Sequence, residues 1–324
     1  MHVRRARAED GHGIHVAHTA AIRETCRTHY EPAEIEVWAA RTTPRNYDDD
    51  MAARDVVVGE LDGRIVGFGV LDVHDAEVRA VYVHPAAGRR GVGRRLLDAL
   101  EALARLRGLS RVCLDSSLNA VPFYAAAGWR REHDTTHTIA EGLAIPCVHM
   151  TKRLTALALV VREESPDDAA GVAAVVRAAF ARDDEALLVE RLRQAGALAF
   201  SLVAILDGAV VGHVAFSTVD VDGAAGRVLG LAPLAVTPLY QGCGIGARLV
   251  EEGLARARER GVAAAVVLGH GGYYRRFGFD AASRYGIRYR VPVPADAFMA
   301  AELMAGALVR ATGVVRYRPE FDGL

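Results

Sequence analysis

Residues 241–246 of the chain read Gln241-Gly242-Cys243-Gly244-Ile245-Gly246, between a strand-like run and a long amphipathic helical pattern. Closely spaced glycines let several backbone N–H groups converge on one anion, and the N-terminus of the following helix adds partial positive charge. The pattern therefore predicts a turn that binds phosphate, and a pyrophosphate group would suit it.

A related turn lies in the first half of the chain and reads Gly88-Arg89-Arg90-Gly91-Val92-Gly93. Gly91 precedes Gly244 by 153 residues. The arginines of this turn, with Arg94 after it, add cations that favour a ligand with several phosphates. A helix cap alone can explain one glycine turn. Two such turns in the same context favour two anion-binding sites.

The surrounding sequence repeats with the same order. Val83-His84-Pro85 recurs as Val236-Thr237-Pro238 before the second turn. Further upstream, each half has a strand-like opening, a helical stretch and two strand-like runs joined by Asp-Gly, which is a strong hairpin signal. Because 324 residues exceed the usual size of one domain, we expect two domains, residues 1–154 and 157–324.

Each half predicts strand, helices, antiparallel meander, helix, strand, helix and strand, which fits an α+β sandwich better than alternating βαβ units. For the first half we expect strands at 2–7, 56–61, 65–71, 76–83, 112–114 and 148–153, and helices at 91–107 and 121–127. For the second half we expect strands at 157–163, 202–206, 210–221, 228–236 and 264–268, and a helix at 244–260. About forty residues after Tyr285 belong to the second half alone.

The charges nearly balance, with 39 basic and 40 acidic residues and a pI near 6.9. Such a chain has no overall field that would attract nucleic acid or an anionic membrane, and no apolar run is long enough to span a bilayer. The four cysteines and twelve histidines show neither disulfide-scaffold nor metal-ligand spacing. We therefore expect a soluble, cytoplasmic monomer or homodimer without metal, nucleic acid or membrane.

The turn at residues 241–246 resembles the R/Q-x-x-G-x-G/A signature of the GNAT superfamily of N-acetyltransferases and matches it at every position. The first turn departs from the signature, because Gly88 stands where the family has Arg or Gln. Residues 268–279 also resemble a predicted-acetyltransferase group with a Leu-Gly-x-x-x-Tyr-Tyr-x-x-Phe-Gly-Phe stretch. The resemblance covers nearly the whole chain and implies two tandem GNAT-like mixed-sheet sandwiches, with helices on both faces and a splayed pair of parallel strands.

The resemblance also implies acetyl-coenzyme A as the acyl donor. The two glycine turns would bind its pyrophosphate, and the strand before each turn would pair its backbone with the pantetheine arm. A bulge in that strand would splay the sheet and leave an N–H to polarise the thioester carbonyl. The strand residues implied are Val81, Tyr82, Val83, Leu234, Ala235 and Val236.

Amine acetylation requires an ammonium group to lose a proton and a thiolate, with a pKa of about 8.5 as the free thiol, to gain one. Tyr124 matches the family's helix whose tyrosine protonates the thiolate, and Asn119 matches a residue that contacts the cofactor. Tyr274 precedes Gly278 as Tyr124 precedes Gly128. Half-buried tyrosines that only pack the helix are the alternative.

Glu77 lies fourteen residues before Gly91, where some family members carry a general base, and the second half has Gly230 there. A solvated carboxylate is the structural alternative for Glu77, and water could then serve as the base. The main hypothesis is direct transfer of acetyl to a small amine or peptide amino group in a ternary complex. One half could instead be a non-catalytic binding or sensing module, and a tandem transferase similar to mycothiol synthase is a further alternative.

Overall fold

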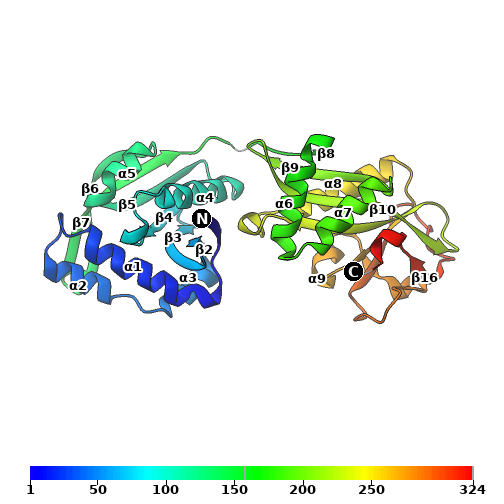
Figure 1. Ribbon diagram of the computed structural model, residues 1–324, viewed down its shortest axis with the longest axis horizontal. Helices are drawn as coiled ribbons and strands as arrows, with labels where there is room; N and C mark the ends of the chain where they lie inside the picture. Colours follow the sequence, from blue (N-terminus) through cyan, green and yellow to red (C-terminus); the bar gives the residue numbers. More distant parts are fainter. Residues whose placement is uncertain (157, 323–324) are drawn as a thin grey trace. The chain divides into compact units, whose positions relative to one another are not determined.

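The computed structural model describes residues 1–156 and 158–322. The chain divides into two compact units, Met1–Leu157 and Ala158–Leu324, and each unit has its own mixed sheet (Figure 1). The predicted α+β class with two tandem mixed-sheet sandwiches is confirmed. Among the described residues, no helix has both the length and the apolarity that a bilayer span requires.

The first unit has the strand order β1-β2-β3-β4-β5-β7-β6, in which only the pair β4 and β5 runs parallel. Its helices and strands are β1 (His2–Arg5), α1 (Gly11–Thr25), α2 (Pro32–Ala40), α3 (Asn46–Ala53), β2 (Asp55–Leu61), β3 (Arg64–Asp72), β4 (Glu77–Val83), α4 (Val92–Leu106), β5 (Arg111–Ser117), α5 (Val121–Ala126), β6 (Arg130–Ala140) and β7 (Leu143–Arg153).

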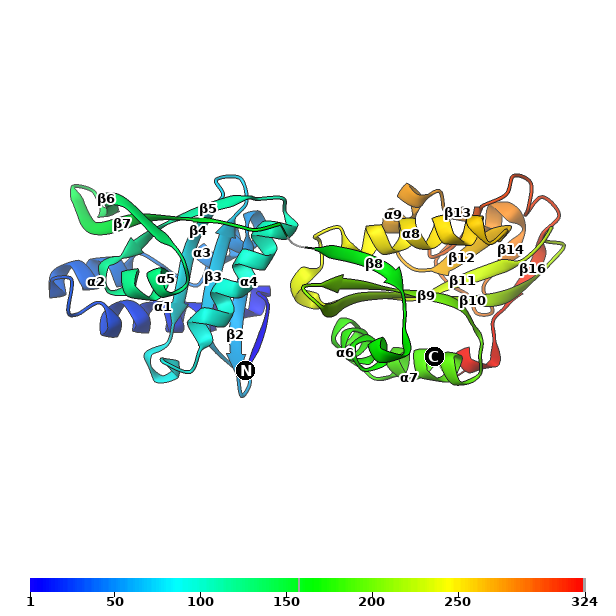
Figure 2. The ribbon, with the colours of Figure 1, turned by 90° about the horizontal axis from the view of Figure 1, so that it is seen from above.

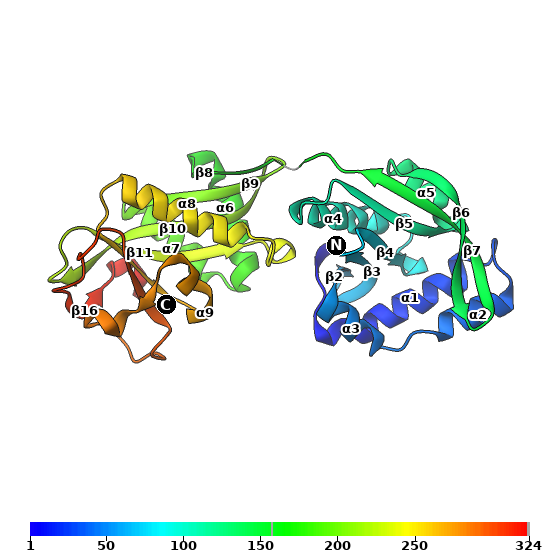
Figure 3. The ribbon, with the colours of Figure 1, turned by 180° about the vertical axis from the view of Figure 1, so that it is seen from behind.

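Helices cover both faces of this sheet, and Figure 3 shows α1 and α4 on opposite sides of it. On the α4 face the strands need glycine, because a Cβ at Gly69 would come within 2.7 Å of Leu100 Cδ1. Leu96, Leu100 and Leu103 of α4 are spaced along one side of the helix and are fully buried. On the other face, Phe68 and Val70 of β3 pack with residues of α1 and α3.

A buried polar group fixes α4 to the far end of the sheet. Glu101 of α4 accepts hydrogen bonds from Lys152 Nζ at 2.7 Å and from Trp129 Nε1 at 3.0 Å. Only 4% of Glu101 is exposed, so its charge depends on Lys152 for compensation. This contact keeps the helix that follows the first glycine turn in place.

The second unit has the strand order β13-β15-β12-β11-β10-β16-β14, with β9 also against β10 and β8 against β9. Figure 2 shows α6 and α7 on one side of this sheet and α8 on the other. The helices and strands are β8 (Leu159–Glu163), α6 (Ala169–Phe180), α7 (Asp184–Gln194), β9 (Leu198–Leu206), β10 (Ala209–Asp222), β11 (Val228–Val236), α8 (Ile245–Glu259), β12 (Ala264–Leu268), α9 (Gly271–Tyr274), β13 (Asp280–Ala281), β14 (Ile287–Arg288), β15 (Phe298–Glu302) and β16 (Thr312–Arg316).

The predicted order of elements is correct, but several bounds and two segments differ. The opening strand of the first half ends at Arg5 instead of residue 7, and the opening strand of the second half begins at Leu159 instead of residue 157. Residue 157 lies outside the described residues. β6 was not predicted, and β7 begins five residues earlier than expected. Most side chains of β6 are exposed, so the segment lacks the apolar alternation of a half-buried strand. After Tyr285, β15 pairs with β12 as β7 pairs with β5, so this part completes the repeat.

Candidate functional site

The strand before each glycine turn contains an irregularity in its pairing. In β4, Ala80 pairs with Val70 but Val78 pairs with Leu71, so Arg79 is an extra residue. In β11, Leu234 pairs with Val214 but Leu231 pairs with Phe216, which leaves two residues of β11 opposite one of β10. Both halves therefore carry the bulge that the family resemblance implied.

The bulge in β4 changes which face of the sheet each side chain reaches. Tyr82 and Ala80 lie on the face covered by α1 and α3. Simple alternation from these residues would place Glu77 on the α4 face. The extra residue reverses the alternation, so Glu77 lies on the α1 face with Tyr82. The equivalent bulge in β11 places Gly230 on the corresponding face of the second sheet.

Past the bulges, the two parallel strands of each sheet separate. In the first unit only Glu77 pairs with β5, at Cys113, although both strands continue beyond this point. In the second unit β11 pairs with β12 from Val228 to Gly230 and then continues to Val236 without β12. Each sheet is thus open at its centre, next to the glycine turn, and the unpaired edge of the strand can bind an extended ligand.

The two glycine turns have nearly the same backbone conformation. Gly88 (φ −60°, ψ 151°) matches Gln241 (φ −61°, ψ 150°), and Gly91 (φ 78°) matches Gly244 (φ 83°) as the N-cap of α4 or α8. The two helices were predicted to begin at Gly91 and Gly244, and in the structure each begins one residue later. Arg89 adopts the left-handed φ of 58° where the second turn has Gly242 at 74°. The departure from the family signature at Gly88 leaves the shape of the turn unchanged.

Three glycines of these turns have open space where a side chain would lie. An added Cβ at Gly91, Gly242 or Gly244 would meet no atom within 4 Å among the described residues. A phosphate group can therefore approach the backbone N–H groups at the start of α4 and α8. In the second turn the Gln241 side chain donates to the Val236 carbonyl oxygen at 3.1 Å, a contact that Gly88 cannot make.

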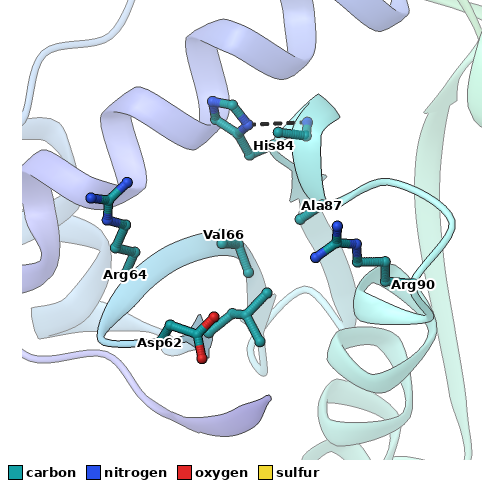
Figure 4. A pocket seen from close by; sticks show the side chains of 8 residues that line it. Asp62, Arg64, Val66, His84, Ala87 and Arg90 are labelled. Carbon is teal, nitrogen blue, oxygen red and sulfur yellow. Dashed lines mark hydrogen bonds between the residues drawn. The ribbon is translucent and has the colours of Figure 1, made fainter.

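Basic side chains flank the first turn. Arg90 lines a depression of about 390 Å³ together with Arg64 and His84 (Figure 4). His84 Nδ1 accepts a hydrogen bond from the Ala86 N–H at 3.2 Å, which orients the imidazole at the rim. Arg94 lies on the outer side of α4 and pairs with Asp98 at 2.8 Å. Arg90 thus lies at the first turn in a depression that it shares with the carboxylate of Asp62, whereas the charge of Arg94 is paired with Asp98.

Tyr124 and Tyr274 occupy equivalent places on the short helices α5 and α9. Their side chains are 7% and 8% exposed, and burial raises the pKa of both hydroxyls. Each hydroxyl is thus protonated at neutral pH, which is the state that a proton donor needs. Both rings also pack against neighbouring aromatics, Tyr124 against Trp129 and Tyr274 against Phe279.

Glu77 and its counterpart differ between the units. Burial is the main cause that raises the pKa of Glu77, and Arg79, which it pairs with at 3.2 Å, opposes this change. At Gly230 a Cβ would meet the ring of Tyr317 at 2.9 Å, so an aromatic side chain takes the space of a carboxylate. A general base at this place is therefore available in the first unit alone among the described residues.

The two units also match known protein families. A model of the GNAT acetyltransferase domain matches residues 26–154, and a model of the GNAT acetyltransferase family matches residues 170–279. The uncharacterized N-acetyltransferase YhbS of Escherichia coli is 44% identical over 165 residues, which cover 51% of this chain and 99% of YhbS. The chain belongs to the GNAT family of acetyltransferases. It carries two GNAT domains in tandem.

Two further comparisons support this assignment. The uncharacterized N-acetyltransferase YjhQ of Escherichia coli is 38% identical over 134 residues, which cover 40% of this chain and 74% of YjhQ. The crystal structure of Escherichia coli YhbS in complex with CoA has a TM-score of 0.50 and 45% sequence identity, over 52% of this chain and 93% of that chain. Each relative thus corresponds to about one GNAT domain of the chain.

Asn119 lies near the end of α1 rather than pointing freely into the splayed centre. Its Oδ1 accepts from Cys26 Sγ at 3.5 Å, and its Nδ2 donates to Thr25 Oγ1 at 3.5 Å. The contact with Thr25 is at the upper limit of hydrogen-bond length and a thiol is a weak donor, so contact of Asn119 with the cofactor stays a prediction. The described His, Cys, Asp and Glu side chains form no group of three that could hold a metal ion.

A cavity that was not predicted from the sequence lies in the first GNAT domain, on the α1 face beside the β4 bulge. Its volume is about 370 Å³, and aromatic rings form much of its lining. Among them are His18 of α1, Tyr47 of α3, Phe68 of β3 and Tyr82 of β4, and the His18 and Tyr82 ring centroids are 4.1 Å apart. Tyr82, which we expected only as a backbone contact, therefore also shapes this cavity.

The second GNAT domain has different chemistry at the same place. By strand register, His213 and Ala235 replace Phe68 and Tyr82. His213 is fully buried, and its Nε2 lies 3.1 Å from Glu164, which also accepts a hydrogen bond from Ser201 at 2.6 Å. A polar cluster thus stands where the first domain has an aromatic cavity.

Proposed function

We propose that the protein transfers an acetyl group from acetyl-CoA to a small amine, by direct transfer within a ternary complex. One observation carries the proposal: in each domain a bulged strand separates from its parallel neighbour and ends at an open glycine turn at a helix N-terminus. A ligand with an extended arm and a pyrophosphate fits this arrangement, and the structure of the relative YhbS is a complex with CoA.

The donor would lie along the unpaired part of β4 or β11. Residues Val81 to Val83 and Leu234 to Val236 offer backbone N–H and C=O groups to the pantetheine amides. The glycine turns at 88–93 and 241–246 offer N–H groups to the pyrophosphate, and Arg90 and Arg94 add positive charge in the first domain. In this position the thioester lies beside the bulge.

The residues of the first domain then have separate tasks. Glu77, on the α1 face of the sheet, removes a proton from the ammonium group of the acceptor. Its raised pKa suits this task better than the pKa of a solvated Glu. A backbone N–H at the bulge stabilises the negative charge that develops on the carbonyl oxygen as the C–N bond forms. Tyr124 donates its proton to the departing thiolate sulfur as the C–S bond breaks, so that CoA leaves as a thiol. The second proton, which the nitrogen loses when it becomes an amide, passes through water and restores the Tyr124 hydroxyl.

The test is thiol release from acetyl-CoA in the presence of a panel of small primary amines, with mass spectrometry of the products. We expect amine-dependent release and one N-acetylated product per thiol. Binding of acetyl-CoA without acetylation of any amine in the panel would contradict the proposal.

The second domain has a second candidate role, because Tyr317 fills the space of the general base at Gly230. It could bind acetyl-CoA without catalysing transfer, with Tyr274 as a packing residue. A variant with Gly91→Asp, which disables the first turn, tests this role. Loss of turnover with retention of one acetyl-CoA site would support it, and retained turnover would show that the second domain is catalytic.

A further inference from the structure

The cavity on the α1 face of the first domain lies beside the β4 bulge, on the same face of the sheet as Glu77. Its volume of about 370 Å³ is at the small end of the range for ligand sites, and its aromatic lining suits an apolar group. Because Tyr82 and Arg79 line the cavity and Glu77 is the pairing partner of Arg79, a ligand there lies next to the proposed base. The charges around the cavity therefore bear on the acceptor of the reaction.

We propose that this cavity binds a small primary amine that carries a carboxylate, with the carboxylate held by Arg41 and Arg79. The proposal rests on the function proposed above and names the acceptor class for it. An amino acid with an aromatic or apolar side chain has the three groups that the cavity selects: a ring or chain, a carboxylate and an amine.

Arg41 and Arg79 reach the cavity from different elements. Arg41 is the C-cap of α2, and its Nη1 donates to the Thr138 carbonyl oxygen at 2.6 Å and lies 3.3 Å from His137 Nε2. No carboxylate among the described residues pairs with Arg41. Arg79 is the extra residue of the β4 bulge, and bulges often redirect a side chain toward a site. Two guanidinium groups, one without an acidic partner, thus line a cavity of amino-acid size.

The other titratable groups of the lining do not cancel these charges. Asp50 is paired with Arg54 at 2.7 Å. Burial, followed by the charge of Arg41, lowers the pKa of His137, so its imidazole is neutral at neutral pH. Burial lowers the pKa of His18 to about 3, so His18 is neutral as well. The cavity is therefore positive, and it favours an acceptor with an anionic group over a neutral one.

The position of the amine follows from the same contacts. Arg79 Nη1 and Glu77 Oε2 are 3.2 Å apart in an exposed ion pair. The carboxylate of a bound ligand would compete with Glu77 for the Arg79 guanidinium. The amine of an α-amino acid lies two bonds from its carboxylate and so comes close to Glu77 and the splayed centre of the sheet. The buried Nε2 of His18, which has no hydrogen-bond partner among the described residues, is a further polar group on the cavity wall.

Calorimetric titration of the CoA-loaded full chain with three probes tests the proposal. The probes are phenylalanine, phenethylamine, which lacks the carboxylate, and 3-phenylpropionate, which lacks the amine. We expect phenylalanine and 3-phenylpropionate to bind at least tenfold more tightly than phenethylamine. Arg41→Gln should weaken both by about tenfold to a hundredfold, because it removes a charge-assisted hydrogen bond, and should leave phenethylamine unchanged.

Arg27→Gln is the matched control, because Arg27 is exposed, donates to the Arg23 carbonyl oxygen and does not line the cavity. Arg79→Gln is the second variant. Equal binding of phenylalanine and phenethylamine, or phenylalanine binding that neither variant weakens, would overturn the proposal. Arg41-dependent binding of phenylalanine without any thiol release from acetyl-CoA would instead overturn the proposed function and leave the carboxylate site in place.

Discussion

Replacing Glu77 by Gln tests the proposed general base, because the amide keeps the shape of the side chain and removes its ability to take a proton. General-base help contributes about a hundredfold to ten-thousandfold in rate, so we expect kcat to fall by at least about a hundredfold. kcat and kcat/KM should fall together, since the interaction is made in the transition state.

The pH dependence of the rate tests the ionisation state in which Glu77 acts. Glu77 acts as a base only when ionised, so the rate of the wild type should rise with pH through the pKa of Glu77. That pKa is raised, mainly by burial, so the rise should lie above the pH expected for a solvated Glu. Glu77→Gln should remove this rise. Arg79→Gln should move it upward by at most about 0.7 pH units, because an exposed ion pair stabilises by no more than about 1 kcal/mol.

The assay is thiol release from acetyl-CoA at saturating acceptor across pH, with Gly244→Asp present in every variant so that the second domain is silent. Saturating acceptor separates the effect of Arg79 on the pKa from its effect on acceptor binding. A Glu77→Gln variant with full turnover at every pH would refute the base assignment, and water would then be the better candidate.

Tyr124→Phe should lower kcat at least about a hundredfold while the Kd for acetyl-CoA changes little, because the ring packing stays and the proton donor is lost; stopped-flow thiol release and calorimetry measure the two, and full turnover would make this tyrosine a packing residue. Gly91→Asp and Gly244→Asp should each abolish one acetyl-CoA site, because a carboxylate would face the pyrophosphate and the left-handed backbone costs a non-glycine residue about 1–2 kcal/mol. Calorimetry that finds two intact sites in both variants would show that the glycine turns do not bind the pyrophosphate. Lys152→Met should destabilise the first domain by about 3–5 kcal/mol in urea unfolding, because it leaves the charge of Glu101 buried and unpaired, whereas the double change with Glu101→Gln should recover much of the loss.

The sequence was sufficient for those parts of the protein whose signal is local. Each glycine turn is read from residues that are consecutive in the chain, and the β12 strand at 264–268 is a short apolar run with the predicted bounds. The face of Glu77 could not be predicted, because it depends on which residues of β3 and β4 pair. β6 was missed because its side chains are mostly polar and exposed.

The cavity on the α1 face could not be predicted from the sequence for a related reason. Arg41 and Tyr47 lie far from Tyr82 in the chain, and none of the three belongs to a motif with fixed spacing. The same holds for Tyr317, which reaches Gly230 from the end of the chain. These positions are fixed by packing, so only the folded structure shows that they meet.

The central claim is that both domains bind acetyl-CoA at their glycine turns. Isothermal titration of the full chain with acetyl-CoA tests it most directly, with Gly91→Asp and Gly244→Asp measured alongside. We predict a stoichiometry near two for the wild type and near one for each single variant. A wild-type stoichiometry near one, or a value near two that neither variant lowers, would contradict the account.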